Sequence, residues 1–95
     1  MLNELFEIIL DRQTHPQAGS YTNQLLDAGV DAILQKVGEE AVEVILAAKG
    51  QGRQRLTEEV SDLFYHTLVL LAQQGLTLAD VETELMRRNM ARKAG

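Results

Sequence analysis

Apolar residues recur at intervals of three and four along most of this chain, which is the spacing of helices that bury one face. The pattern predicts a first helix over residues 2–12, with Asn3 as a candidate N-cap. Residues 14–20 hold the only proline and a cluster of small polar side chains, which is typical of an ordered loop. The N-terminal part is therefore predicted to be one helix followed by a loop.

A short helix is predicted over residues 21–26. Ser20 or Thr22 provides the hydroxyl for its N-cap, and Gly29 ends it. Its few apolar positions give it a weaker pattern than the segments that follow.

Two long helices are predicted over residues 30–49 and 53–74, with the turn Gly50-Gln-Gly52 between them. Such a short connection makes the two helices antiparallel neighbours. The apolar positions of the first are Ile33, Val37, Ala41, Val44 and Ala48, and those of the second are Leu56, Val60, Leu63, Phe64, Thr67 and Leu71.

A last helix is predicted from Leu78 to about Asn89, and the tail beyond it is expected to fray. Thr77 and Asp80 have the spacing of a capping box, with Asp in place of the usual Glu. Nowhere do β-branched and polar residues alternate over the length of a strand. The fold class predicted is all-α.

Ninety-five residues are one small domain, which we place at residues 1–95, and a domain of this size is only marginally stable alone. The segment 68–72 is apolar on every side, and one short chain has too few helices to surround it. We therefore expect a helical bundle of four main helices that is completed by a second copy, in a homodimer or a higher homo-oligomer.

Charge and composition exclude several classes of protein. The formal net charge of -5 is the wrong sign for a general binder of nucleic acid or of anionic membranes. Absence of cysteine excludes disulfide scaffolds and Cys-ligated zinc sites. No basic leader and no membrane-length apolar run are found, so we expect no membrane partner and a cytoplasmic location.

Two stripes of charged residues lie beside the apolar faces of the long helices. They comprise Lys36, Glu39, Glu40 and Glu43 on the first helix, and Arg55, Glu59, Asp62 and His66 on the second. In antiparallel neighbours these stripes can face one another, so that five carboxylates converge. The alternative is an ordinary solvated surface, but like charges four residues apart, as in Glu39 and Glu43, destabilise an exposed helix. A bound cation reverses that effect, and clustered carboxylates favour Mg²⁺ or Mn²⁺.

The acidic residues form the motif Glu40-x-x-Glu43 followed by Glu59-x-x-Asp62, which resembles the metal-binding signature of the all-α nucleoside-triphosphate pyrophosphohydrolases, the MazG-like superfamily. Within that superfamily the chain is similar to the phosphoribosyl-ATP pyrophosphohydrolase family over residues 2–88. The segments that carry this similarity are Gly19–Thr22, Lys36–Glu43, Glu59–His66 and Leu68–Leu71.

This resemblance implies hydrolysis of phosphoribosyl-ATP to phosphoribosyl-AMP and pyrophosphate, the second step of histidine biosynthesis, by a water that Mg²⁺ activates. We expect the chain to carry this activity without a fused cyclohydrolase. The resemblance implies metal ligands at Glu40, Glu43, Glu59 and Asp62, catalytic roles for Glu39 and Glu43, and substrate contacts from Ser20, Tyr21, Thr22 and Lys36. Glu39 is either a further ligand or the base that orients the water.

Several of these residues have a plainer interpretation. Lys36 is at the spacing of an ion pair with Glu40 as well as within reach of a phosphate, and the residues Ser20–Thr22 suit helix capping and packing equally well. For His66 we expect packing in the core, and for His15 exposed surface. Arg87 and Arg88 suit the end of a helix.

Two other functions remain open. One is a MazG-like enzyme that cleaves ordinary or damaged nucleoside triphosphates with the same acids. The other is a non-catalytic helical dimerisation module. A di-iron carboxylate bundle is disfavoured because the chain has no Glu-x-x-His motif.

Overall fold

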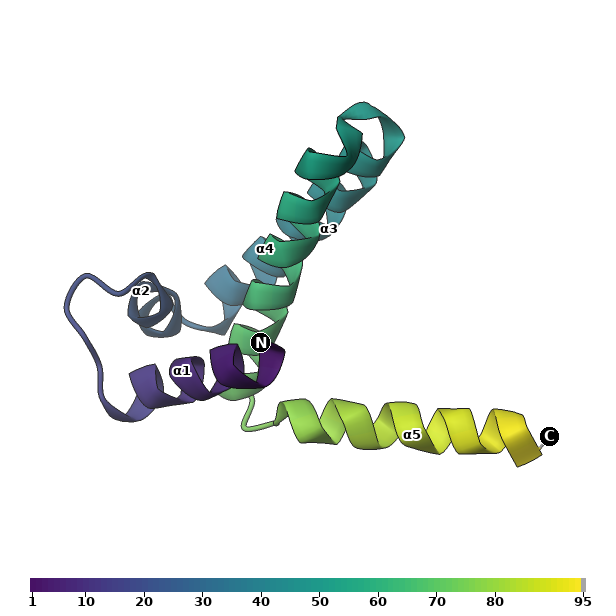
Figure 1. Ribbon diagram of the computed structural model, residues 1–95. Coiled ribbons are helices and arrows are strands. Elements are labelled where there is room, and N and C mark those ends of the chain that lie inside the picture. The colour runs from purple at the N-terminus through teal and green to yellow at the C-terminus, as the bar shows by residue number, and fades with distance from the viewer. Residues whose placement is uncertain (95) are drawn as a thin grey trace.

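The computed structural model describes residues 1–94, and that part of the chain contains helices and no strand. The predicted all-α class is thereby confirmed. The helices are α1 (Leu2–Thr14), α2 (Tyr21–Ala28), α3 (Val30–Gly50), α4 (Gly52–Gln73) and α5 (Leu78–Ala94). The molecule is elongated, with principal extents of 50 × 34 × 24 Å, and the α3–α4 hairpin and α5 extend from it in different directions (Figure 1).

The first two helices differ in how they are capped. Helix α1 begins at Leu2 after Met1, so Asn3 lies inside the first turn and the prediction of an Asn3 cap is wrong. Ser20 caps α2, because its hydroxyl accepts a hydrogen bond from the backbone N–H of Asn23 at 3.2 Å. Gly29 ends α2 as predicted and has a φ of 98°, which suits glycine.

The loop between α1 and α2 is fastened by one buried side chain. Asn23 accepts a hydrogen bond from the backbone N–H of Gln17 at 3.0 Å and donates one to the carbonyl of Arg12 at 2.8 Å. These bonds hold the loop against the end of α1, which confirms that the loop is ordered.

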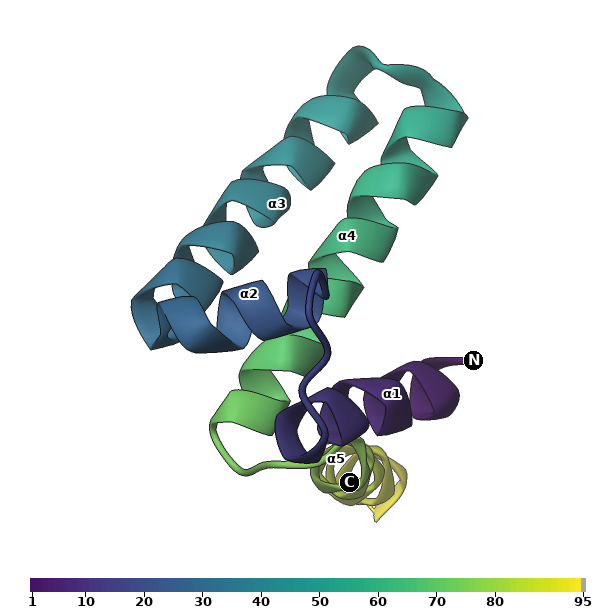
Figure 2. The same ribbon diagram turned by 90° about the vertical axis from the view of Figure 1, so that its left-hand side faces the viewer.

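Helices α3 and α4 form the antiparallel hairpin that the glycine turn predicts, and they lie side by side along their length (Figure 2). The chain reverses at Gln51 and Gly52, where Gly52 has a φ of +88° that other residues rarely adopt. This hairpin sets the acidic stripe of α3 opposite that of α4.

The hydrophobic core lies where α1 and α2 pack against the α3–α4 hairpin. Its largest side chains without exposure to solvent are Ile9, Ile33 and Val69. The core cluster consists of Phe6, Ile9, Leu25, Ile33, Leu68, Val69 and Ala72. The apolar segment 68–72 is thus covered largely by the protomer's own first two helices, and it needs a second copy less than its sequence indicates.

A conservative change in this core tests the packing. Ile9→Val is expected to lower the free energy of unfolding by about 1 kcal/mol, because it removes one methylene from a side chain that is 0% exposed. Ile8→Val is the matched control, since Ile8 is 50% exposed and the same deletion there leaves no cavity. Urea unfolding followed by circular dichroism measures both, and equal losses at the two positions would contradict this description of the core.

The inward side of helix α4 differs from the apolar face that its pattern indicates: it holds Leu68, Val69 and Ala72 together with two polar residues. Glu59 and His66 are buried against neighbouring helices, whereas Phe64 is 49% exposed. The remaining members of the predicted apolar face, namely Leu56, Val60, Leu63, Thr67 and Leu71, are only half-buried. The polar stripe therefore faces the inside of the hairpin, and an apolar face points outward.

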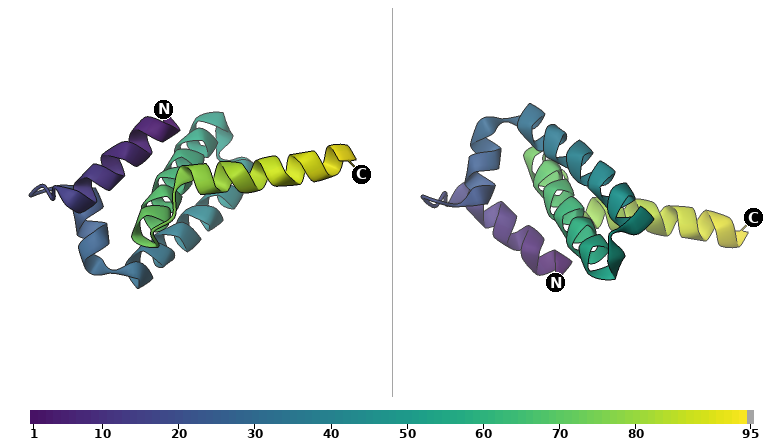
Figure 3. Two further views of the ribbon diagram at one scale, coloured as in Figure 1. Left: turned by 90° about the horizontal axis from the view of Figure 1, so that it is seen from below. Right: turned by 90° about the horizontal axis from the view of Figure 1, so that it is seen from above.

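Helix α5 begins with the predicted capping box. The backbone N–H of Thr77 donates to the Asp80 carboxylate at 2.8 Å, and that of Asp80 donates to the Thr77 hydroxyl at 3.1 Å. The helix continues to Ala94, beyond the predicted end at Asn89. It projects away from the other four helices instead of joining their bundle, as Figure 3 shows from two sides. Only its first turns contact the body, where Leu78 packs against the core.

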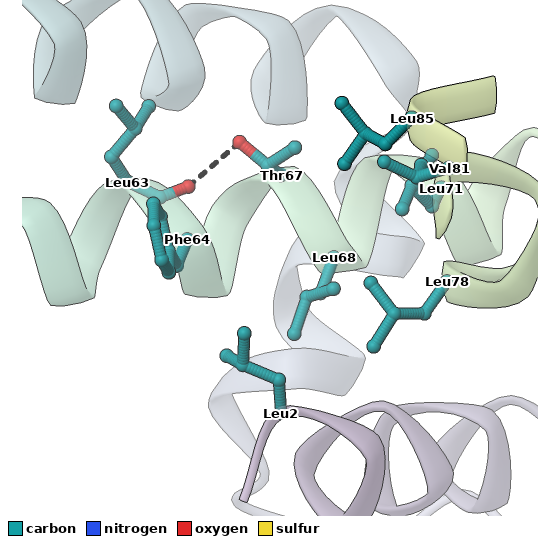
Figure 4. Close-up of a pocket in the computed structure, with 9 residues that line it drawn as sticks. All are labelled: Leu2, Leu63, Phe64, Thr67, Leu68, Leu71, Leu78, Val81 and Leu85. Carbon is teal, nitrogen blue, oxygen red and sulfur yellow. Dashed lines mark hydrogen bonds between the residues drawn. The ribbon is translucent and has the colours of Figure 1, made fainter. Parts of the chain in front are cut away.

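An apolar groove of about 390 Å³ lies between α4, the start of α1 and the first turns of α5 (Figure 4). Its lining is Leu2, Leu63, Phe64, Thr67, Leu68, Leu71, Leu78, Val81 and Leu85. The one hydroxyl among them, on Thr67, donates to the carbonyl of Leu63 at 2.7 Å and leaves the groove without a free donor. Among residues 1–94, no helix combines the length and the apolar character that a membrane span requires.

Candidate metal centre

Three carboxylates from the two long helices meet inside the hairpin. One oxygen each from Glu40 on α3 and from Glu59 and Asp62 on α4 lies within 4.8 Å of the other two. On α4 the two acids are three residues apart, so they share one side of the helix. The prediction that the acidic stripes face one another is confirmed for these three residues.

Burial and mutual repulsion act together on this cluster. Glu59 is buried, Glu40 is half-buried and Asp62 is exposed. The pKa of the Glu40 carboxyl is raised, first by burial, then by a hydrogen bond with Glu59, and then by the negative charges of Asp62 and Glu59. The charge of Lys36, one turn earlier on α3, partly opposes this rise. The cluster therefore carries more negative charge than its own surroundings balance.

One arginine pairs with the buried member of the cluster. The Arg55 guanidinium forms an ion pair with Glu59, and a second of its nitrogens lies 2.9 Å from a carboxylate oxygen of Glu58. These carboxylates, together with the charge of Glu43, raise the pKa of Arg55. Arg55 lies on the charged stripe of α4, and the spacing Arg55-x-x-x-Glu59 is the sequence signal for this pair.

The other two predicted carboxylates stand apart from the three. Glu43 is half-buried and its charge acts on Arg55, while Glu39 is exposed. Neither belongs to the group of oxygens that lie within 4.8 Å of one another. The structure thus brings together Glu40, Glu59 and Asp62, and not all five of the acids that were predicted to converge.

Lys36 is half-buried on α3 and makes no ion pair with Glu40 in the part of the chain that the structure describes. Its charge still acts on Glu40, whose raised pKa it partly opposes.

The Ser20–Thr22 segment contacts α4 just beyond the acids. The Tyr21 hydroxyl lies 2.9 Å from Nε2 of His66, and Nδ1 of His66 lies 2.8 Å from the backbone carbonyl of Asp62. A carbonyl only accepts, so Nδ1 donates to it, and Nε2 of the neutral ring accepts from Tyr21. The Thr22 and Tyr65 hydroxyls are also hydrogen-bonded, and the Tyr21 and Tyr65 rings are stacked with centroids 6.1 Å apart.

These contacts confirm that His66 is packed and hydrogen-bonded in the core, where it is 5% exposed. They also give Tyr65 a part that the sequence did not reveal, namely to hold α2 against α4. Tyr21 is 45% exposed, so part of its side chain remains open to solvent beside His66, one turn after Asp62.

The remaining predicted residues lie away from the cluster. His15 is exposed as expected and pairs with Asp11 at 3.1 Å. Arg87 and Arg88 are exposed, and both pair with Glu84 on α5.

The donor set fits a hard divalent cation. Carboxylate oxygens from two helices are the ligands that Mg²⁺ and Mn²⁺ prefer, and the pKa of one of these carboxyls, Glu40, is raised by burial, by its hydrogen bond with Glu59 and by the neighbouring negative charges. Glu40, Glu59 and Asp62 are placed to hold such an ion.

The burial and crowding of negative charge in the cluster predict that the free energy of unfolding depends on pH. In the absence of divalent ions, the raised pKa of Glu40 contributes stability that is complete below its ordinary value of about 4.5 and is lost as pH rises through the raised value. Glu40→Gln removes the ionisation, so its stability relative to wild type is expected to increase between pH 4 and pH 7. Urea unfolding in EDTA at several pH values measures this, with Glu39→Gln, the same change at an exposed position, as control. A difference that stays constant or shrinks as pH rises would contradict the prediction.

Comparison with known proteins gives one consistent match. A family model described as phosphoribosyl-ATP pyrophosphohydrolase matches residues 2–89. The phosphoribosyl-ATP pyrophosphatase of Listeria monocytogenes serovar 1/2a is 57% identical over 88 residues, which are 93% of this chain and 84% of that protein. The phosphoribosyl-ATP pyrophosphatase of Clostridium acetobutylicum is 48% identical over 89 residues, which are 94% of this chain and 81% of that protein.

A further relative is longer. The histidine biosynthesis bifunctional protein HisIE of Oceanobacillus iheyensis is 52% identical over 85 residues, which are 90% of this chain and 40% of that protein. The chain thus spans less than half of the bifunctional relative and most of the length of the two pyrophosphatases. The range matched by the family model, residues 2–89, contains the acidic cluster and the Ser20–Thr22 segment.

Proposed function

The chain belongs to the phosphoribosyl-ATP pyrophosphohydrolase family, and from that premise we propose that it hydrolyses phosphoribosyl-ATP to phosphoribosyl-AMP and pyrophosphate in histidine biosynthesis. The observation that carries the proposal is the cluster of Glu40, Glu59 and Asp62, whose oxygens lie within 4.8 Å of one another inside the α3–α4 hairpin. Enzymes that cleave phosphoanhydrides use such carboxylates to bring metal ions to the phosphates.

In this proposal Glu40, Glu59 and Asp62 hold Mg²⁺ or Mn²⁺, and Glu43, on the same helix as Glu40, is the fourth ligand and also a catalytic residue. A divalent ion in such a site neutralises charge on pyrophosphate oxygens and activates water. Glu39 is exposed beside the cluster, where its carboxylate is available to orient the attacking water and to accept its proton. Substituting Glu39 and Glu43 one at a time distinguishes the role of metal ligand from the role of base.

Substrate contacts are proposed at the residues that border the cluster. Lys36 has an ammonium group without an ion-pair partner among residues 1–94, and we assign it to a phosphate. Tyr21 donates to His66 and its oxygen can still accept from a ribose hydroxyl, whereas Ser20 accepts from Asn23 and can still donate. Thr22 is buried and hydrogen-bonded to Tyr65, so we assign it to holding the segment in place.

We also propose that the enzyme is a homodimer, or a higher homo-oligomer, in which a second copy covers the apolar groove. The groove lies on the outward face of α4, and α5 presents further exposed apolar side chains beyond it, including Met86 and Met90. A second copy brings the same apolar surface, so one two-fold contact covers both. The cytoplasmic location, and the absence of nucleic-acid and membrane partners expected for a net charge of -5, stay predictions.

The test of the proposed function is pyrophosphate release from phosphoribosyl-ATP, ATP and dUTP, each with Mg²⁺ or with EDTA. Release from phosphoribosyl-ATP alone, abolished by EDTA, is the expected result. Comparable release from ATP or dUTP would instead indicate a MazG-like enzyme of broader specificity. No release from any of the three would contradict the enzymatic function.

A further inference from the structure

We propose that Arg55 is a built-in counter-ion of the metal centre: it neutralises Glu59 in the metal-free protein, and it turns to a phosphate of the substrate when a divalent cation takes Glu59. This inference rests on the proposed function, because it concerns the same acidic cluster. It gives Arg55 two roles: it binds the substrate, and it competes with the metal for Glu59.

Arg55 connects a buried and an exposed carboxylate of α4. One nitrogen pairs with Glu59, whose side chain is 6% exposed, and the other pairs with Glu58, whose side chain is 44% exposed. Gln54 also donates to Glu58 at 3.1 Å, which steadies the exposed carboxylate. If Arg55 leaves Glu59, it still has the Glu58 carboxylate to hold it near the centre.

The charges around Arg55 explain why it pairs with Glu59. Glu40, Glu59 and Asp62 gather their oxygens within 4.8 Å of one another, and Arg55 is the one cationic side chain among residues 1–94 that forms an ion pair with any of the three. The charge of Glu43 acts on Arg55 as well. The guanidinium thus contacts the acidic motif of α4 and also feels the charge of Glu43 in the motif of α3, so it compensates part of the charge that a cation would compensate.

A divalent cation and Arg55 compete for the same carboxylate. A cation bound to Glu59 reduces the attraction between that oxygen and the guanidinium, and two positive charges this close repel each other. The guanidinium is then free at the edge of the centre, where the phosphates of the substrate would meet the metal. Its planar fork matches two phosphate oxygens, which a lysine ammonium does not.

The experiment compares Arg55→Gln with Arg53→Gln, which removes the same charge from an exposed position two residues earlier on α4 with no ion pair in the described chain. Mn²⁺ binding is measured without substrate by calorimetry and by the electron paramagnetic resonance of free Mn²⁺. We expect Arg55→Gln to bind Mn²⁺ about threefold to tenfold more tightly than wild type, because one nearby positive charge is gone, and Arg53→Gln to bind it as wild type does.

The second measurement is KM for phosphoribosyl-ATP at saturating Mn²⁺. Here Arg55→Gln is expected to raise KM about tenfold, because it lacks the phosphate contact. Arg55→Lys keeps the charge but not the fork, so it should restore the wild-type Mn²⁺ affinity and leave KM raised. Tighter metal binding together with weaker substrate binding distinguishes this role from a merely structural one, which would weaken both.

Unchanged or weaker Mn²⁺ binding by Arg55→Gln, with wild type binding Mn²⁺ and releasing pyrophosphate, would overturn the counter-ion role and leave the proposed function intact. An unchanged KM would overturn the phosphate contact. Failure of wild type itself to bind Mn²⁺ would overturn the metal centre, and with it both proposals.

Discussion

Glu59→Gln is expected to lower kcat/KM for pyrophosphate release from phosphoribosyl-ATP by at least about 100-fold, which corresponds to about 2.7 kcal/mol of lost transition-state stabilisation. Glu59 is the buried member of the acidic cluster, at 5% exposure, and its oxygen lies within 4.8 Å of oxygens from both Glu40 and Asp62. Glutamine keeps the size of the side chain but removes the charge that a hard cation requires. Steady-state kinetics over a range of Mg²⁺ concentrations measure the loss, which excess Mg²⁺ should only partly restore.

The matched control for this change is its neighbour. Glu58→Gln makes the same chemical change one residue earlier, and Glu58 also pairs with Arg55, but it is exposed and lies outside the cluster. It should lower kcat/KM far less than Glu59→Gln does, because it weakens only the outer contact of Arg55. Equal losses in the two variants would show that the acids act through Arg55 and not as metal ligands. Circular dichroism of both variants separates loss of activity from loss of fold.

The candidate site could be predicted from the sequence because its acids lie at helical spacing on two helices joined by a short turn. What the sequence did not give is which acids meet. Glu40 and Glu43 have the same helical spacing from the turn as Asp62 and Glu59, so the pattern favours both equally, whereas the structure gathers only Glu40 with Glu59 and Asp62. The hydroxyl and imidazole contacts of Tyr21, Thr22, Tyr65 and His66 depend on how α2 crosses α4, which no local pattern encodes.

The elements themselves were predictable because caps and glycines mark their ends, as Ser20, Gly29 and Gly52 do. The arrangement of the helices was less so. An amphipathic helix is expected to turn its apolar face inward, but α4 buries Glu59 and His66 and leaves Phe64 half exposed. Helix α5 likewise has an apolar stripe, and the other helices of the protomer cover little of it. Both exceptions leave apolar side chains exposed to solvent in the single chain.

Phe64→Glu changes the outward apolar face of α4 and is expected to convert the proposed dimer into a monomer at micromolar concentration. Phe64 lines the groove of about 390 Å³ and is 49% exposed, and Figure 4 shows it next to Leu63 on α4. Burying a carboxylate against such a surface costs at least about 3 kcal/mol, or roughly 100-fold in the dissociation constant. In a two-fold dimer the substitution occurs twice, so the effect on assembly is larger still.

Ile8→Glu is the control for this change, because Ile8 is 50% exposed, nearly the same as Phe64 at 49%, and does not line the groove. Light scattering after size-exclusion chromatography should find wild type and Ile8→Glu as dimers and Phe64→Glu as a monomer. A wild-type monomer at these concentrations, or a Phe64→Glu dimer, would contradict the assignment of this face. Because the groove and the acidic cluster occupy different faces of α4, pyrophosphate release by the monomeric variant then tests whether the metal centre works without a second copy.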